Sequence, residues 1–420
     1  MRKIIVALLL LIIFVYSFSY QSVSAADTKS TWWEFQSIDT MKYSRDLARE
    51  KLNNQEFDQV INQQVANIAS AGASHVGIAT PYDEEFFPFL KRWVDAARKN
   101  NLKVWFRGNF SGWEHWFNYP KISRAEHLGK VRDFIKKHPD IFENGDVFTS
   151  CPECENGGPG DPRMVGGVED FRKFLIDEYQ VTKQGFKDIG KDVKSNFFSV
   201  NFDVAKLIFN KDTTAKLDGV VTIDHYVKTP EKLISDIQYL SNYSGGRVVL
   251  GEFGAPIPDI HGQMSAEQQA EWLEKALYLL AQKRDIVLGL NYWLSVGGST
   301  QIWDGKGNPK PAVSTLSHYY IPQKTLTIEV KSDIKTPVSQ ASINWLGRQY
   351  FTDSKGRVTI SYPSQIATES SLLVDGVKAG FSQVAAFITP RDSLVPISLV
   401  KTKPNIFYRI YASLLKLLNL

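Results

Sequence analysis

The chain has 420 residues, of which 43% are hydrophobic and 22% are charged, a composition typical of a packed globular protein with room for one large and one small domain. The formal net charge is +4 and the basic residues are scattered along the chain, so we expect no nucleic acid partner. Aromatic residues make up 12% of the chain, including 10 Trp, which favours some rings lying on a surface that meets flat apolar faces.

The first residues have the pattern of a secretory signal. Arg2-Lys3 precedes an apolar run from Ile4 to Tyr16, and small residues follow at 23–25. The run is short for a bilayer core of about 30 Å, and an uncleaved anchor is the alternative interpretation. We predict a signal peptide over residues 1–26 and a secreted or cell-surface protein.

Eight short apolar segments come next, each followed by a helical pattern, with a repeat of about 35 residues. Their β-branched and aromatic residues are typical of buried strands. Eight such units in roughly 290 residues predict an α/β fold, the (β/α)8 TIM barrel, over residues 27–322. The predicted strands are Trp32 to Ile38, His75 to Ala79, Lys103 to Arg107, Asp146 to Cys151, Asn196 to Asn201, Gly219 to Asp224, Arg247 to Leu250 and Ile286 to Tyr292.

After Ile321-Pro322 the pattern changes to strands and turns. Residues 325–330 alternate apolar and polar side chains, and Asp353-Ser354-Lys355-Gly356 predicts a turn before a strand at 357–360. We predict a small β-sandwich over residues 323–402.

The last residues, 403–420, predict an amphipathic helix. Its apolar face contains Ile406, Ile410 and Leu414, and the segment is too short and too charged to span a membrane. Peripheral association with a membrane and docking on another protein surface are both open.

Two glutamates follow predicted strands about a hundred residues apart. Glu153 lies in Cys-Pro-Glu-Cys-Glu-Asn after strand four, and Glu252 lies in Gly-Glu-Phe-Gly after strand seven. In such barrels the ends of the strands build the active site, and strands four and seven face each other across the mouth. Two carboxyl groups about 5–5.5 Å apart cleave a glycosidic bond with retention of configuration. The pair predicts acid/base catalysis by Glu153, in a less polar setting, and nucleophilic attack by Glu252.

At these residues the chain resembles glycoside hydrolase clan A, and family 5 in particular, from about residue 30 to 322. The motif at 251–254 is similar to the clan's nucleophile motif. The resemblance implies that Tyr226 donates a hydrogen bond to the nucleophile, that Trp293 forms the floor under the sugar, and that Arg107 is the cation beside Glu252. The predicted β-sandwich resembles the carboxypeptidase-regulatory-like modules that accompany secreted glycosidases, either as a cap or spacer or as a glycan-binding module.

The chain departs from the clan pattern at two positions. Pro152 replaces the asparagine whose amide contacts the sugar 2-hydroxyl. Either Asn156 or Asn201 supplies that contact, or the acid is Glu155 in place of Glu153. At strand six Asp224 stands where the clan has histidine, and alternation along the strand points His225 to the other side.

We therefore predict a retaining glycosidase that acts on a β-linked oligo- or polysaccharide, with Arg107, Asn201, Tyr226, His225, Glu155 and Trp293 as candidate substrate contacts. The alternative is a non-catalytic carbohydrate-binding barrel. His115 and His261 have no partner at metal-ligand spacing, so we expect neither metal nor cofactor. The sequence has no signal for an oligomeric state.

Two local features remain. Cys151 and Cys154 are the only cysteines of a chain predicted to be exported, and we predict a disulfide between them, which we favour over a thiol redox motif. Four aromatic residues gather around strand three and its loop, where stacking on sugars and packing under the loop are both open: Trp105, Trp113, Trp116 and Tyr119.

Overall fold

The protein is described by a computed structural model that covers residues 31–163, 167–366, 370–376, 380–388, 393–403, 406, 409, 410 and 413. The predicted signal peptide lies outside these residues, as does most of the predicted C-terminal helix. No helix in the described part of the chain has both the length and the apolar character of a membrane span.

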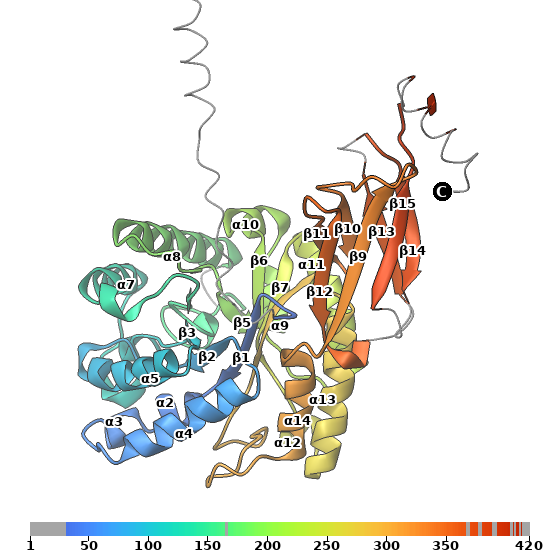
Figure 1. Ribbon diagram of the computed structural model, residues 1–420. Coiled ribbons are helices and arrows are strands. Elements are labelled where there is room, and N and C mark those ends of the chain that lie inside the picture. Colours follow the sequence, from blue (N-terminus) through green and yellow to red (C-terminus); the bar gives the residue numbers. More distant parts are fainter. Residues whose placement is uncertain are drawn as a thin grey trace, which may run out of the picture. The chain divides into compact units, whose positions relative to one another are not determined.

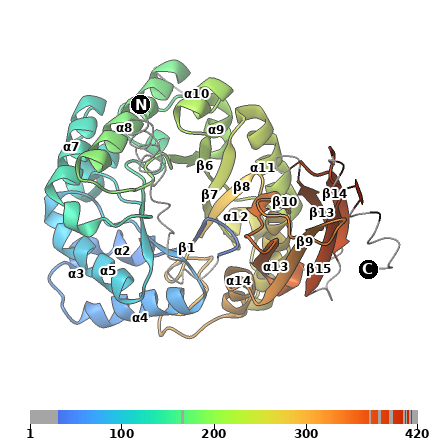
Figure 2. The same ribbon diagram turned by 45° about the horizontal axis from the view of Figure 1, so that its top comes forward.

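Eight parallel strands form one curled sheet in the order β4-β3-β2-β1-β8-β7-β6-β5 (Figures 1 and 2). The first and last strands of the series, β1 and β8, are neighbours, as a barrel requires. The predicted barrel is confirmed. Its strands are β1 (Phe35–Asp39), β2 (His75–Ile78), β3 (Lys103–Phe106), β4 (Val147–Phe148), β5 (Ser199–Asn201), β6 (Val220–Asp224), β7 (Arg247–Phe253) and β8 (Val287–Tyr292).

The seam between β4 and β5 is closed without a regular ladder. A single parallel bridge joins Val147 to Lys194, and the Phe148 N–H donates to the Lys194 carbonyl at 2.8 Å. Farther along, the Thr149 hydroxyl donates to the Phe197 carbonyl at 2.8 Å. The fourth strand is therefore shorter than predicted, because the chain leaves the sheet after Phe148.

Helices surround the strands (Figure 2). Their apolar stripes lie against the sheet, as the periodicity of the sequence predicts, although Val60 on α4 is 36% exposed and lies outside the buried stripe. The helices are α2 (Met41–Ser44), α3 (Ala48–Lys51), α4 (Phe57–Ser70), α5 (Phe87–Lys99), α6 (Ser111–Glu114), α7 (Arg124–Lys137), α8 (Val168–Asp188), α9 (Phe202–Ile208), α10 (Lys211–Lys216), α11 (Pro230–Ser244), α12 (Pro258–His261), α13 (Ala266–Ala281) and α14 (Pro311–Tyr320).

The interior of the barrel is a packed apolar core, not a channel. The Trp105 indole is fully buried there and donates to the Thr149 hydroxyl at 2.9 Å. Because the middle of the barrel is filled, polar chemistry is confined to the ends of the strands. The core residues are Phe35, Trp105, Val147, Phe197, Val220, Val249 and Leu288.

Beyond α14 the chain forms two small sheets, of order β11-β10-β13-β14 and β12-β9-β15. Trp345 of the first sheet meets Tyr362 of the second edge to face, with ring centroids 5.3 Å apart. The predicted turn is present, because the Gly356 N–H donates to the Asp353 carbonyl at 3.0 Å. The strands are β9 (Lys324–Ser332), β10 (Ser342–Trp345), β11 (Arg348–Phe351), β12 (Arg357–Tyr362), β13 (Ser370–Asp375), β14 (Gln383–Ile388) and β15 (Leu394–Leu399).

The β sheets and the barrel meet at a buried cation. The Arg284 guanidinium lies 3.7 Å from the centre of the Trp32 ring and donates to the Tyr350 hydroxyl at 2.7 Å. The Trp32 ring also contacts Trp345, with centroids 6.0 Å apart. Burial lowers the pKa of Arg284 to about 10, because the neighbouring groups do not fully replace its hydration.

Candidate functional site

Four polar side chains converge around Arg107 where the strands end, and its guanidinium contacts three of them directly. Arg107 follows β3 and is 1% exposed. Its guanidinium donates to Glu252 at 2.7 Å, lies 3.0 Å from an Asp39 oxygen, and is 3.9 Å from Asp224. A second hydrogen bond goes to the Gly251 carbonyl, which also accepts from the Asn291 amide at 2.8 Å. One cation thus links β1, β3, β6 and β7.

Burial opposes the charge of Arg107, but the carboxylates around it, Asp224 first, raise its pKa above the ordinary value. The cation is therefore permanent, and it holds the carboxylate of Glu252 in place. Arg107 was predicted to lie beside Glu252, and the structure brings the two side chains together. Asp39 and Asn291 were not anticipated.

Glu252 is a buried carboxylate with a donor on each oxygen. Arg107 donates to Oε1, and the Tyr226 hydroxyl donates to Oε2 at 2.9 Å. Burial raises the pKa of Glu252 to about 7 against the lowering effect of Arg107, and the charge of Glu153 adds to the rise. Trp293 lies beside Tyr226, with ring centroids 5.9 Å apart. Strand β7 runs through Phe253, so Glu252 belongs to the strand and does not follow it.

A bulge beside Glu252 brings two acidic side chains together. The register between β6 and β7 shifts after Ile223, so that Gly251 is extra and Asp224 pairs with Glu252. A Cβ on Gly251 would lie 2.5 Å from the Asp224 carboxylate, so only glycine fits there. Burial, and then the charge of Glu252, raise the pKa of Asp224 well above its ordinary value.

Glu153 lies at the start of a short turn after β4. Its backbone is left-handed, with φ 46° and ψ 45°, and its N–H donates to the Ser199 carbonyl at 2.7 Å. Cys151 and Cys154 are paired in a disulfide with their Cα atoms 5.3 Å apart, as predicted. The side chain of Glu153 is only partly buried and makes no hydrogen bond to another described residue. The expectation that Glu153 occupies the less polar setting is wrong, because the left-handed turn leaves its side chain partly exposed.

Glu155 occupies that setting instead. It is 2% exposed, and its Oε1 accepts from the Asn201 backbone N–H at 2.6 Å and from the Asn201 amide at 3.1 Å. Its Oε2 is buried without a partner among the described residues. Burial raises the pKa of Glu155 to about 7, against the hydrogen bonds of Asn201. Asn201 is therefore a support for Glu155.

A third glutamate, Glu114 at the end of α6, was not predicted from the sequence. Burial raises its pKa to about 8, the Arg45 cation lowers it, and the charge of Glu153 raises it further. The Asn109 amide donates to Glu114 at 3.4 Å. Glu114 also packs against Gly157, just beyond Glu155. The only signal in the sequence was its place within the aromatic cluster.

The remaining candidate residues contact other side chains of the protein. The His225 ring bonds Asp236 of α11 at 2.9 Å and stacks on Phe202 at 4.3 Å, so it is directed at helices and does not reach Glu252. The ring therefore points away from Glu252, as strand alternation predicts. Trp105 and Trp113 are buried, whereas Trp116 is partly exposed beneath the Arg45 guanidinium at 4.8 Å.

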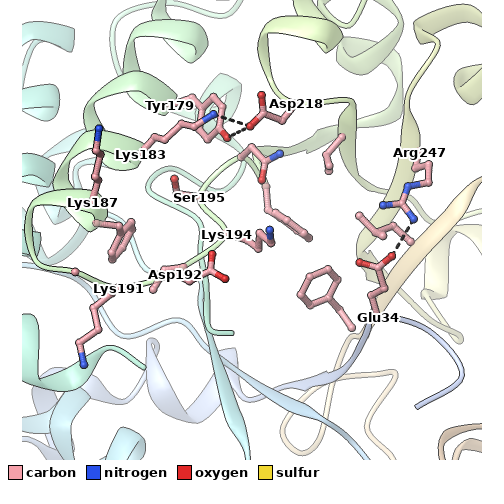
Figure 3. A pocket seen from close by; sticks show the side chains of 18 residues that line it. Glu34, Tyr179, Lys183, Lys187, Lys191, Asp192, Lys194, Ser195, Asp218 and Arg247 are labelled. Carbon is pink, nitrogen blue, oxygen red and sulfur yellow. Dashed lines mark hydrogen bonds and ion pairs between the residues drawn. The ribbon is translucent and has the colours of Figure 1, made fainter. Parts of the chain in front are cut away.

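Within the described residues, no group of three or more His, Cys, Asp or Glu side chains is arranged to hold a metal ion. A separate cavity of about 570 Å³ lies at the other end of the barrel, where β1, β6, β7 and β8 begin (Figure 3). Its rim is formed by ion pairs such as Lys183 with Asp218 and Arg247 with Glu34. None of the carboxylates described above lines this cavity, so it is not part of the candidate site.

Comparison with solved structures finds proteins of similar fold. A GH5_18 protein from Streptomyces cattleya, solved in complex with Manb1-4GlcNAc, matches with a TM-score of 0.51 and 15% identity over 71% of this chain and 84% of that chain. The two proteins share a fold.

Two further structures are similar at lower TM-scores. Beta-glucuronidase 2 from Bacteroides uniformis has a TM-score of 0.45 and 11% identity, over 81% of this chain and 44% of that one. Xylanase 10B from Thermotoga maritima has a TM-score of 0.45 and 14% identity, over 66% of this chain and 97% of that one. This chain therefore spans less than half of the glucuronidase. No protein-family model and no curated protein matches the chain.

Proposed function

We propose that the chain is a retaining glycoside hydrolase that cleaves a β-linked glycan by double displacement. The observation that supports this most is the setting of Glu252, a buried carboxylate at the end of a barrel strand whose two oxygens are held by Arg107 and Tyr226. These donors fix the direction of the carboxylate, as attack at an anomeric carbon needs. Glu252 is the proposed nucleophile.

Glu153 is the proposed acid/base. A carboxyl group in this role must reach the glycosidic oxygen of the substrate, and the side chain of Glu153 has no hydrogen bond to other described residues that would compete. Glu155 is the alternative, since its raised pKa keeps a proton near neutral pH, but its Oε1 is bound by Asn201. In both versions the group protonates the leaving oxygen and then deprotonates the water that releases the sugar.

Two substitutions distinguish these glutamates. In an enzyme without its acid/base, substrates with good leaving groups still form the glycosyl-enzyme, and azide restores turnover because it needs no deprotonation. We expect azide rescue for Glu153→Gln and none for Glu155→Gln. The reverse result would transfer the role to Glu155.

The nucleophile is tested by covalent trapping. A fluorinated glycoside with a good leaving group should accumulate on one peptide, and peptide mass spectrometry should find it on the peptide that contains Glu252. Glu252→Gln should fold normally, as checked by circular dichroism, and lose several orders of magnitude in kcat. A label on another peptide, or near-normal hydrolysis by the variant, refutes the assignment.

The remaining parts of the chain have proposed roles around this activity. We propose that residues 1–26 direct export, so that the enzyme acts outside the cytoplasm on an oligo- or polysaccharide. The β sheets from Lys324 to Leu399 are proposed as a carboxypeptidase-regulatory-like cap or spacer, and residues 403–420 as a peripheral membrane or docking helix. We propose no cofactor for the reaction.

A further inference from the structure

The cavity at the end of the barrel where the strands begin has an apolar floor (Figure 3). Phe35, Phe197 and Leu288 line it, and all three belong to the apolar core of the barrel. The rings of Phe35 and Phe197 meet edge to face, with centroids 5.0 Å apart. The volume of about 570 Å³ lies within the range of small-molecule sites. The floor therefore suits the flat apolar part of a small ligand.

Two carboxylates on the rim of this cavity are already neutralised. Asp218 accepts a hydrogen bond from the Lys183 ammonium at 2.7 Å. Glu34 pairs with Arg247 at 2.9 Å. Each pair cancels one positive and one negative charge, so neither favours a charged ligand of either sign.

Three lysines of the cavity have no ion pair within the described residues: Lys187, Lys191 and Lys194. In the same part of the chain, Asp192 is the one carboxylate of the cavity without an ion pair, so three cations face a single anion. Figure 3 shows Lys194 between the two ion pairs of the rim with no dashed line to either, whereas Lys187 and Lys191 lie at the edge. An excess of cations around an apolar floor attracts an anion.

We propose that this cavity binds a small aromatic carboxylate, with its ring on the floor and its carboxylate paired with Lys194. The ring would pack against Phe35, Phe197 and Leu288, and the charge would supply the partner that the lysine lacks. A neutral ring leaves Lys194 unpaired, and a small anion such as acetate leaves the floor uncovered. The cavity is separate from the site around Glu252, so the inference does not depend on the proposed hydrolase activity.

Calorimetric titration of the full-length chain at pH 7 tests the ligand class with three probes: 2-naphthoate, its neutral analogue 2-naphthamide, and acetate. We expect 2-naphthoate to bind at least tenfold more tightly than either of the others. Its advantage over the amide should shrink with added salt, because the pair with Lys194 forms at an exposed position. Equal binding of the amide, equal binding of acetate, or no binding of 2-naphthoate overturns the inference.

Two substitutions of exposed residues locate the carboxylate. Lys194→Met keeps the apolar stem and removes the charge, so it should weaken binding of 2-naphthoate about tenfold and leave 2-naphthamide unaffected. Asp192→Asn removes the opposing charge and should strengthen binding of 2-naphthoate at least twofold. Lys355→Met, at an exposed position far along the sequence, is the matched control and should change nothing. Circular dichroism checks that each variant is folded. If folded Lys194→Met binds 2-naphthoate as tightly as the wild type, the carboxylate lies elsewhere and the proposal is wrong.

Discussion

At the scale of single residues, the ionisation of Glu252 depends on a balance that one hydroxyl can shift. Its pKa is about 7, raised by burial and lowered by Arg107 and by the hydrogen bond from Tyr226. A nucleophile must be ionised, and the ionised fraction of Glu252 grows as the pH rises through 7. The kcat/KM of the proposed hydrolase should therefore rise over the same interval.

Tyr226→Phe removes a hydrogen bond that favours the ionised carboxylate. The rising part of the kcat/KM profile should move to higher pH by about one unit, and kcat at pH 7 should fall accordingly. The measurement is a pair of pH–rate profiles on one substrate. Tyr243→Phe, on the exposed side of α11, is the control. An unmoved profile would mean that the Tyr226 hydroxyl does not tune Glu252.

Glu155 should give stability a measurable dependence on pH. Its pKa in the folded protein is about 7, against an ordinary value of 4.5, so the folded chain retains a proton that the unfolded chain releases between these values. The stabilising contribution of this proton is complete below pH 4.5 and is lost as the pH rises through 7.

Glu155→Gln cannot ionise and escapes this loss. Relative to wild type, the variant should gain on the order of 2 kcal/mol in unfolding free energy between pH 4 and pH 8. Denaturant titrations at the two pH values measure the gain, with Glu56→Gln as the exposed control. A difference between variant and wild type that does not change with pH would contradict the raised pKa of Glu155.

Glu252, Tyr226 and Arg107 could be predicted as site residues from their positions in the sequence. Each lies at or just beyond a buried strand, where the alternation of apolar residues and the clan resemblance agree. Other site residues depended on packing that the pattern does not contain. Glu114 comes from a short helix in a long loop, and its place is set by close contact with Gly157. Asp39 lies at the end of β1 and Asn291 lies within β8. The sequence pattern of these strands indicates burial and does not mark either residue as part of a site.

At the scale of elements, the segment after β4 combines an irregular backbone with a local covalent link. Cys151 and Cys154 enclose Glu153 in a very small ring, and a small ring removes little entropy from the unfolded chain. The disulfide should therefore position the segment more than it stabilises the fold.

The double variant Cys151→Ser/Cys154→Ser separates these effects. Its unfolding free energy should fall by about 2 kcal/mol or less. Its kcat should fall at least tenfold, because Glu153 and Glu155 lose their fixed placement. Wild-type protein with and without a reductant provides the comparison, after alkylation and mass spectrometry have established which cysteines are paired. Unchanged kinetic constants would show that the link has no part in positioning.

The boundaries of the strands show where sequence patterns lose information. The run from Asp146 to Cys151 predicted one long strand, but the chain leaves the sheet after Phe148, and backbone bonds to Lys194 and Ser199 replace a ladder. The prediction for β7 errs in the other direction. The strand continues through Phe253, because Glu252 pairs with Asp224 of β6 beyond the bulge and Phe253 pairs with Tyr292 of β8. Hydrophobic alternation identifies buried strands, whereas pairing with the neighbouring strand decides where they end.

At the scale of the whole molecule, the barrel and the β sheets should unfold together. Arg284 of the barrel is buried against Trp32 and bonded to Tyr350 of β11, so separating the two parts exposes a cation–ring contact and breaks a hydrogen bond. Calorimetry of the wild type should give one transition.

Arg284→Met and Tyr350→Phe should each lower the midpoint of that transition. In a double-mutant cycle their effects should fall short of additivity by about 1 kcal/mol, because both remove the same hydrogen bond. Lys355→Met, at an exposed position in the turn before β12, is the control. Two separate transitions in the wild type, with only one moved by the variants, would contradict the coupling.

The groups that Arg107 connects across the barrel come from two halves of the chain. Strands β1 to β4 and the segment after them supply Asp39, Arg107 and Glu153, whereas β5 to β8 supply Asp224 and Glu252. A half-barrel cut in the loop before β5 would hold either the cation and the proton donor or the nucleophile, but never both. Hydrolysis regained on mixing two inert fragments would thus be a direct readout of ring closure, and the proposed activity belongs to the closed ring and to neither half.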